Sequence, residues 1–180
     1  MLSEEPNYTR VPVVRQCPAD MDTPLSVHGG EQWGRYSIIG LPCRERIEVR
    51  GHTVRLIADE QVLEESTVSN PLKWIEHYTA QFKSPDLPNL PRFTGGLVGY
   101  FGYETVKYVE PRLAGPAKPD ALNVPDILLM LCEELVVFDN IQGTLYVIVH
   151  GDPSSDDDMT RAGERADDLV NQLAQQTLHL

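Results

Sequence analysis

Alternating apolar and charged positions predict paired strands in the first half of the chain. In residues 46–51, "RIEVRG", and residues 52–59, "HTVRLIAD", apolar side chains alternate with charged or polar ones. This is the period of a strand that has one face in solvent and one face against a core. Gly51 and His52 lie at the junction of the two runs, so a tight hairpin is expected there.

Other segments with β-branched and apolar character predict further strands around this hairpin. Residues 34–41, "GRYSIIGL", and residues 60–66, "EQVLEES", are the candidates, and the second of them would be short. Residues 8–16, "YTRVPVVRQ", contain Pro12, which lacks the N–H that a central strand needs. We therefore expect an edge strand or an irregular lead-in at this position.

The longest apolar runs lie in the C-terminal half. Residues 127–139, "ILLMLCEELVVFD", and residues 144–150, "TLYVIVH", are almost continuously apolar, which is typical of strands covered on both faces. The four residues "NIQG" join them, and Gly143 can take the left-handed conformation of a short hairpin loop. These runs carry the strongest strand signal in the chain.

A first helix is expected over residues 70–82, "NPLKWIEHYTAQF". Asn70 can cap this helix, and Pro71 suits its first position because the missing N–H costs nothing there. The apolar stripe that should pack on a sheet consists of Leu72, Ile75, Tyr78 and Phe82.

A second helix is expected after the sheet-breaking dipeptide Asp152-Pro153, running to about residue 176. Ser155 and Asp158 form a capping box at its start, where acidic side chains also suit the helix dipole. Its modest apolar stripe consists of Met159, Ala162, Ala166, Leu169, Val170 and Leu173. Together the elements predict an α+β fold, with a mostly antiparallel sheet core and a few packed helices, in a single domain spanning residues 1–180.

Residues 95–104, "GGLVGYFGYE", place four glycines among aromatic and aliphatic side chains. Glycine is used where the backbone approaches another group closely or takes a positive φ. A phosphate-binding loop would need GxxxxGK[ST] or GxGxxG, and neither pattern is present. We expect a strand whose small residues admit a neighbouring element, while Leu97, Tyr100 and Tyr103 fill pockets.

Charge and composition limit the partners. The formal net charge of -12 disfavours nucleic acid and anionic membrane, because both are bound mainly through Lys and Arg. Cys17, Cys43 and Cys132 are odd in number, far apart and without a CxxC pair, so we expect reduced thiols and no disulfide framework or zinc site. No signal-like or transmembrane segment occurs in the sequence. These features favour a cytoplasmic protein.

The sequence contains no set of residues with catalytic or metal-binding spacing. The histidines form no HxxxH pair, and neither Ser26 nor Ser37 lies in a nucleophile elbow. The acidic run at 156–158 is expected to be a solvated helix start. The five histidines are His28, His52, His77, His150 and His179. We therefore assign no catalytic residue, no metal ligand and no cofactor to the chain.

Four segments nevertheless stand in an order that is characteristic of a known family. They are "ADMDTPLS" (19–26), "GGEQWGRYSIIGLP" (29–42), "LPRFTGGLVGYFGYETVKYVE" (90–110) and "PDILLMLCEELVVFDN" (125–140). With these motifs the chain resembles the N-terminal region of anthranilate synthase component I, the chorismate-using large subunit that starts tryptophan biosynthesis. The resemblance extends from about residue 11 to about residue 150.

The resemblance implies the regulatory and scaffolding part of a larger subunit. In this family a separate catalytic half binds chorismate and magnesium and forms anthranilate and pyruvate, and a glutamine amidotransferase subunit supplies ammonia. None of the motifs of that half occurs before Leu180, so we expect an excised fragment or a truncated chain that is inactive alone. The glycine stretch is expected near the join between the halves. Without the catalytic half, an apolar face including some of Leu97, Tyr100 and Tyr103 should be open and promote self-association.

Two alternatives stay open at this point. The large subunit of aminodeoxychorismate synthase shares the glycine stretch but usually has an aspartate where this chain has Ser37. A stand-alone binding or interaction domain would have kept the fold and lost the chemistry.

The resemblance also identifies a gap and two candidate site residues. After a segment like "DTPLS" the family usually has about fifteen further residues that end in Leu-Leu-Glu-Ser, whose serine contacts the feedback inhibitor tryptophan. Here Ser26 is followed directly by Val27, so a stretch is expected to be missing. The family places a basic residue near the inhibitor at the "GRYS" segment. The resemblance therefore assigns Arg35 and Ser37 to tryptophan binding; the alternative for Arg35 is an ordinary arginine at a strand end.

Overall fold

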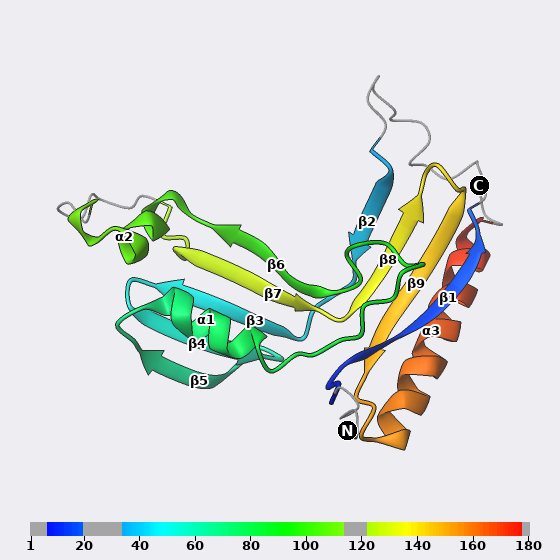
Figure 1. Ribbon diagram of the computed structural model, residues 1–180, viewed down its shortest axis with the longest axis horizontal. Coiled ribbons are helices and arrows are strands. Elements are labelled where there is room, and N and C mark those ends of the chain that lie inside the picture. Colours follow the sequence, from blue (N-terminus) through cyan, green and yellow to red (C-terminus); the bar gives the residue numbers. More distant parts are fainter. Residues whose placement is uncertain (1–6, 20–33, 114–121, 178–180) are drawn as a thin grey trace, which may run out of the picture. The chain divides into compact units, whose positions relative to one another are not determined.

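The computed structural model describes residues 7–19, 34–113 and 122–177 (Figure 1). The chain divides into two compact units, each of which contains one sheet. The first unit comprises Met1–Pro42, Phe82–Gly96 and Cys132–Leu180, and the second comprises Cys43–Gln81 and Leu97–Leu131. Helices pack on antiparallel strands, so the predicted α+β class is confirmed.

The first unit holds a four-stranded antiparallel sheet in the order β1-β9-β8-β2. Its elements are β1 Val11–Pro18, β2 Tyr36–Gly40, β8 Glu134–Asp139, β9 Thr144–Gly151 and the helix α3 Asp156–Thr177. β8 and β9 are central and almost entirely buried, as expected for strands covered on both faces. Pro12 lies on β1 at the edge of the sheet, opposite His150, which confirms the expected edge strand.

Helix α3 packs against this sheet and completes its core (Figure 1). A Cβ on Gly151 would lie 2.9 Å from Met159 Sδ, so the end of β9 closely approaches the first turns of the helix. The predicted apolar stripe of the helix is confirmed for Ala162, Ala166 and Leu169, which lie in this core, and for Val170 and Leu173, which pack against it. The cluster consists of Val136, Phe138, Leu145, Val147, Val149, Ala162, Ala166 and Leu169.

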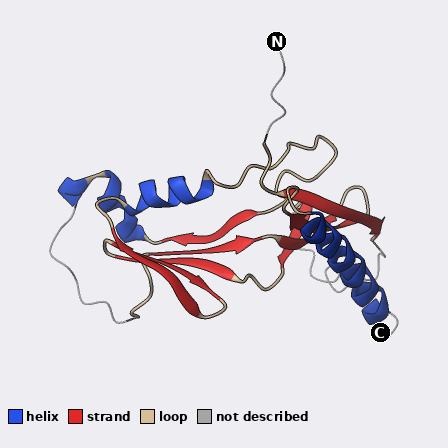
Figure 2. Cartoon of the chain, turned by 90° about the horizontal axis from the view of Figure 1, so that it is seen from below, coloured by secondary structure: helices blue, strands red, loops and turns tan. Residues whose placement is uncertain are grey.

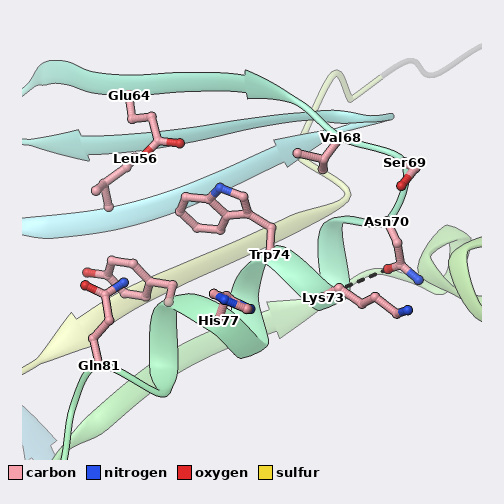
Figure 3. A pocket seen from close by; sticks show the side chains of 10 residues that line it. Leu56, Glu64, Val68, Ser69, Asn70, Lys73, Trp74, His77 and Gln81 are labelled. Carbon is pink, nitrogen blue, oxygen red and sulfur yellow. Dashed lines mark hydrogen bonds between the residues drawn. The ribbon is translucent and has the colours of Figure 1, made fainter.

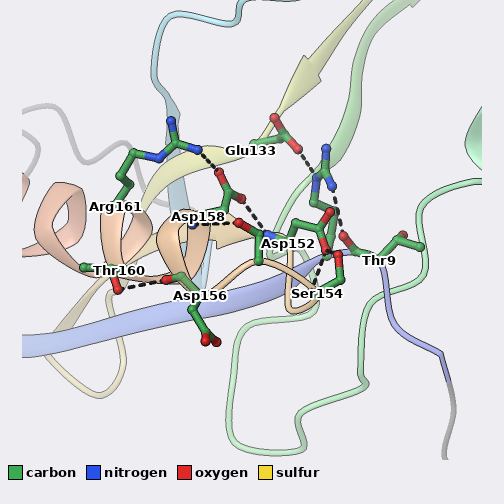
Figure 4. A network of polar contacts seen from close by, with 10 residues as sticks. Thr9, Glu133, Asp152, Ser154, Asp156, Asp158, Thr160 and Arg161 are labelled. Atoms are coloured by element: carbon green, nitrogen blue, oxygen red, sulfur yellow. Dashed lines mark hydrogen bonds and ion pairs between the residues drawn. The ribbon is translucent and has the colours of Figure 1, made fainter.

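The start of α3 is fixed by polar contacts (Figure 4). The Ser155 hydroxyl accepts the Asp158 N–H at 3.2 Å, as in the expected capping box. The Ser155 N–H donates to the Asp152 carbonyl at 3.1 Å, whereas Asp158 Oδ2 accepts the Asp152 N–H at 2.7 Å. Asp158 Oδ1 also accepts a hydrogen bond from Arg161 Nη2 at 2.8 Å. The acidic side chain thus links the end of the sheet to the first turn of the helix.

The second unit holds a five-stranded sheet in the order β5-β4-β3-β7-β6, and its helical segments lie on one side of the sheet (Figure 2). The strands are β3 Glu45–Arg50, β4 Thr53–Ala58, β5 Gln61–Thr67, β6 Gly96–Phe101 and β7 Ile127–Cys132. The helices are α1 Pro71–Thr79 and α2 Val106–Val109, with 3-10 turns at Tyr103–Thr105 and Pro111–Leu113. The core comprises Ile47, Val49, Val54, Ile57, Ile75, Tyr78, Tyr108, Ile127, Leu129 and Leu131.

Two hairpin turns contain the glycine that the sequence predicts, and a third turn contains no glycine. Gly51, with φ of +56°, turns the chain between β3 and β4, and Gly143, with φ of +60°, turns it between β8 and β9. Both predictions are confirmed. The turn between β4 and β5 has positive φ at Asp59 and Glu60, neither of which is glycine. The Glu60 carboxylate accepts hydrogen bonds from Arg46 at 2.8 and 3.0 Å, which hold this turn.

Two predicted elements are corrected. Residues 127–139, taken as one apolar run, are two strands in different sheets, because the chain leaves the ladder at Glu133. The Glu133 carbonyl accepts the His150 N–H at 3.0 Å, and its carboxylate pairs with Arg10 at 2.6 Å, which satisfies the polar groups at this crossing. The helix predicted over 70–82 ends at Thr79, whose hydroxyl donates to the carbonyl of Ile75.

The glycine stretch lies against other parts of the protein, as expected. A Cβ on Gly99 would lie 1.9 Å from the Leu128 oxygen of β7, and one on Gly95 would lie 2.6 Å from the His150 ring. The expectation that its side chains fill pockets is wrong for Tyr100 and Tyr103, because the first is exposed and the second is 91% exposed. The open apolar face expected at these two tyrosines is therefore confirmed.

Candidate functional site

The structure brings the two predicted site residues together at one end of the first unit's sheet. Arg35 directly precedes β2, and Ser37 is the second residue of that strand. Tyr36 of β2 pairs with Asp139 of β8, so the start of β2 lies beside the end of β8. We call the resulting group the Arg35 cluster; it consists of Arg35, Ser37, Asp139 and Asn140.

Asp139 is at the centre of the Arg35 cluster. Its side chain is only 2% exposed, and it is the only buried charged residue in the described part of the chain. Oδ1 accepts the N–H groups of Ile141 and Gln142 at 3.0 and 3.1 Å, and so shapes the turn between β8 and β9. Oδ2 accepts Nε and Nη2 of Arg35 at 3.2 and 3.1 Å. Both oxygens are thus occupied by donors.

The environment favours the ionised form of Asp139. Desolvation is the largest single influence and raises its pKa, because burial penalises the charge. The backbone N–H of Gln142, the Arg35 guanidinium and the N–H of Ile141 together outweigh desolvation and hold the pKa below its ordinary value. A carboxyl group with a lowered pKa and with both oxygens occupied is a poor candidate for a general acid or base.

The Arg35 guanidinium faces solvent while its position is fixed from behind. Its side chain is 50% exposed, and its carbon atom Cζ lies 4.8 Å from the centroid of the Tyr36 ring. The hydrogen bonds to Asp139, more than any other influence, raise the pKa of Arg35 above its ordinary value. Among the described residues, the contacts of Arg35 use Nε and Nη2 and leave Nη1 without a protein acceptor.

Asn140 ties the start of β2 to this group. Its N–H donates to the Arg35 carbonyl at 2.8 Å, and its Nδ2 donates to the Gly34 carbonyl at 2.9 Å and to Ser37 Oγ at 3.2 Å. Sequence reasoning missed both Asp139 and Asn140. The available signal was an acidic residue that closes a run of four apolar or aromatic residues, where a charge is expensive unless it is paired.

The second unit contains a groove between α1 and the strands β4 and β5 (Figure 3). It has a volume of about 500 Å³, and Trp74 projects into it from the helix. The Trp74 ring stacks on Tyr78 with centroids 5.6 Å apart, and the Tyr78 hydroxyl donates to Glu45 at 2.7 Å. Lys73 also lines the groove but directs its ammonium away from Trp74 (Figure 3). The groove combines aromatic and polar surface without a catalytic pair.

A third polar group is structural. The Tyr108 hydroxyl donates to the Gly51 carbonyl and, at 3.3 Å, to Asp126 Oδ2, which also accepts the Gly51 N–H at 2.6 Å. Burial, followed by the negative charge of Asp126, raises the pKa of Tyr108 well above its ordinary value. The Asp126 carbonyl accepts the Gly102 N–H at 2.8 Å. This group fastens the β3–β4 turn and the segment after β6 to the start of β7.

The described residues contain neither a group that could hold a metal ion nor a helix that could span a membrane. No three His, Cys, Asp or Glu side chains of residues 7–19, 34–113 and 122–177 are grouped so that they could hold a metal ion. Within the same ranges, no helix has the length and apolar character needed to cross a bilayer. His28 and His179 lie outside the described residues, as do Ser26 and the junction with Val27.

Comparison with known proteins identifies the family to which this chain belongs. The sequence profile of the chorismate binding enzyme family matches residues 29–179, which is most of the chain. The chain therefore belongs to the chorismate binding enzyme family. The fold agrees: the crystal structure of anthranilate synthase component I from Streptococcus pneumoniae TIGR4 superposes with a TM-score of 0.58 at 21% identity, over 91% of this chain and 36% of that one.

The curated relatives belong to one kind of enzyme subunit. Anthranilate synthase component 1 of Pseudomonas aeruginosa is 45% identical over 184 residues, covering 93% of this chain and 37% of the relative. The protein of the same name from Neisseria meningitidis serogroup C is 45% identical over 187 residues, covering 93% and 38%. That of Acetivibrio thermocellus is 34% identical over 161 residues, covering 80% and 32%. This chain therefore spans between 32% and 38% of the length of these relatives.

The alignment lengths also bear on the expected gap. Since 93% of a 180-residue chain is about 167 residues, an alignment of 184 residues includes about 17 positions at which the Pseudomonas protein has a residue and this chain has none. That number is close to the roughly fifteen residues expected between Ser26 and Val27.

Proposed function

We propose that this chain is the N-terminal regulatory and scaffolding part of an anthranilate synthase component 1. The observation that carries the proposal is the 45% identity to two proteins of that name across 93% of this chain. The intact enzyme would convert chorismate and glutamine-derived ammonia to anthranilate and pyruvate, under feedback inhibition by tryptophan. In this proposal residues 1–180 form the N-terminal domain, and the chorismate-converting half belongs to the remaining two thirds of such a subunit.

The chemistry of the described residues supports a non-catalytic role for this part. Its buried carboxylate, Asp139, is held as an anion by four donors and is not free to move a proton. The acidic side chains at the start of α3 do not fit a magnesium ion either, because Asp158 is engaged by Asp152 and Arg161. We assign the magnesium expected in the intact enzyme to the part of the subunit that this chain does not cover.

The partners in this proposal are the catalytic half of the same subunit and a glutamine amidotransferase subunit that supplies ammonia. The cytoplasm is the proposed location, because the relatives are biosynthetic enzymes and chorismate chemistry needs no membrane. Arg35 and Ser37 are the residues that we assign to the feedback inhibitor. The exposed guanidinium of Arg35 can offer hydrogen bonds to the carboxylate of an amino acid, and Ser37 follows two residues later on β2.

A chimera tests the proposed function. The chain would replace the matching 37% of the Pseudomonas aeruginosa protein, with the relative's own residues restored at the gap, and anthranilate fluorescence would be followed with chorismate, ammonia and magnesium. We expect the chimera to form anthranilate and the 180-residue chain alone to form none. Anthranilate from the purified chain above the enzyme-free rate, or an inactive but folded chimera, would contradict the proposal. The aminodeoxychorismate branch is tested with the full-length protein to which this chain belongs, and aminobenzoate as its product would favour that branch.

A further inference from the structure

The two carboxylate oxygens of Asp139 accept hydrogen bonds from different groups. Among the described residues, Oδ1 accepts the backbone N–H groups of Ile141 and Gln142 and so holds the β8–β9 turn. Oδ2 accepts the Arg35 side chain, through Nε and Nη2. A carboxylate that served the turn alone would need only the first oxygen. The second oxygen therefore has a different role, which is to fix one edge of the Arg35 guanidinium.

The fixed edge leaves the opposite edge of the guanidinium available. A guanidinium presents five N–H donors in a planar fork, and the Asp139 contacts use one donor of Nε and one of Nη2. Within the part of the chain that the structure describes, the donors of Nη1 and the second donor of Nη2 have no acceptor, and half of the side chain is exposed to solvent. The Tyr36 ring, with its centroid 4.8 Å from Cζ, restricts the plane of the fork further. An edge of this kind is suited to a carboxylate.

A second arginine of the first unit, Arg15, forms an exposed ion pair that serves as a comparison. Arg15 donates from Nε and Nη2 to the two oxygens of Asp167 at 2.6 and 3.1 Å, but the side chain of Asp167 is 59% exposed. Exposed pairs of this kind hold their side chains weakly, because water competes for both partners. The partner of Arg35 is instead buried and immobilised by two further hydrogen bonds. The two pairs share a donor pattern and differ in how firmly the acceptor is held.

We infer that Asp139 is a positioning residue that presents Arg35, in a single orientation, to a ligand carboxylate. The inference rests on the role proposed for Arg35 and adds to it a residue that does not itself touch the ligand. Its effect arises before binding: because the side chain of Arg35 is already ordered, the ligand does not have to immobilise it. Asn140 supports the arrangement by holding the backbone of Arg35 and the hydroxyl of Ser37 in place.

The variant Asp139→Asn isolates this role from the role in the turn. The amide oxygen of asparagine can still accept the N–H groups of Ile141 and Gln142, so the turn is kept. The amide nitrogen then faces Nε and Nη2 of Arg35, and since all three are donors, the contact is lost. Asp167→Asn is the matched control, because it removes the same charge from a pair with similar geometry at an exposed position.

The experiment follows the Arg35 Nε–H signal by nuclear magnetic resonance of the whole chain while acetate is added, with acetamide as the uncharged probe. We expect acetate to shift the Arg35 signal saturably, acetamide to leave it in place, and Asp139→Asn to weaken acetate binding between about twofold and about tenfold. Asp167→Asn should leave the Arg35 response unchanged. Backbone signals of Ile141 and Gln142 report whether the turn is intact in the variant.

The outcomes separate the inference from the role on which it rests. If Arg35 of the wild-type chain does not respond to acetate, the assignment of Arg35 to a carboxylate ligand fails and the inference fails with it. If the wild type responds and Asp139→Asn responds with the same affinity, the inference alone is overturned. A measurement without any variant is also decisive: an Arg35 Nε–H as mobile as that of Arg15 would mean that Asp139 does not position it.

Discussion

Gly99 of β6 lies directly against Leu128 of β7, so closely that a Cβ on the glycine would come within 1.9 Å of the leucine carbonyl oxygen. No real Cβ contact is that short. The oxygen belongs to the backbone of a strand whose neighbours on both sides are fixed in the sheet, so it cannot move by a rotamer change. This contact identifies what approaches the glycine stretch, and it makes glycine a requirement of the fold at this position.

We expect Gly99→Ala to lower the free energy of unfolding by about 2 kcal/mol or more, because the added methyl group forces the two strands apart. Gly34→Ala is the matched control, since the nearest described atom to its Cβ would be the Tyr36 carbonyl oxygen, at 3.7 Å. Urea unfolding of both variants and the wild type measures the difference. Equal stability of the two variants would show that β6 and β7 are not as close as described.

Exposed apolar side chains gather after β6 and predict self-association. Tyr103 is 91% exposed and Val109 is 73% exposed, and groups of such residues tend to be covered by another molecule. We expect dimers or larger species at high protein concentration, and fewer of them in the double variant Tyr103→Ser and Val109→Ser. Ile141→Ser, which removes a similarly exposed side chain from the first unit, should have little effect. Light scattering that finds a strict monomer over a wide concentration range would refute this.

His150 should make stability depend on pH. Burial lowers the pKa of its imidazole, a shift that the charge of Arg10 reinforces and that the contacts with Glu133 oppose. The folded chain thus binds a proton less readily than the unfolded chain, so the contribution of His150 to stability is full above about pH 6.5 and is lost as the pH falls toward its lowered pKa.

The variant His150→Gln tests this dependence. Its free energy of unfolding should fall less than that of the wild type when the pH is lowered from 8 to below 6.5, and urea unfolding at several pH values measures the two slopes. His77→Gln, on the exposed face of α1, keeps His150 and should follow the wild type. A steeper decline in His150→Gln than in the wild type would contradict a lowered pKa of His150 in the folded chain.

Much of the fold follows from local pattern. The β3–β4 hairpin was predictable because alternation and a turn glycine at position 51 agree, and α3 because its cap and apolar stripe agree. The division of residues 127–139 between two sheets was not, because both pieces are apolar and only Glu133 marks the crossing. Periodicity reports that a strand is buried and does not report which sheet it joins.

The candidate site was predictable only in part, for a related reason. The resemblance to a family pointed to Arg35 and Ser37, which do lie together. The importance of Asp139 depends on pairing across more than 100 positions of sequence, since β2 lies beside β8 only in the folded chain. An aspartate at the end of an apolar run has the same appearance in sequence whether it faces solvent or is buried against an arginine. Its role became visible only from its burial and its four donors.

For the binding of tryptophan, Arg35 is the charged residue that this chain can still supply. The ammonium and carboxylate of a bound amino acid both need fixed polar partners, and the free edge of Arg35 serves the carboxylate alone, which leaves the ammonium without a partner. Binding at millimolar affinity already requires about 4 kcal/mol. We therefore expect the 180-residue chain to bind L-tryptophan no more tightly than millimolar, and the chimera with the restored gap residues to regain feedback inhibition. Calorimetric titration measures the first expectation: a saturable signal in the micromolar range would show that the pocket is complete in this chain and that our assignment of its missing contacts is wrong.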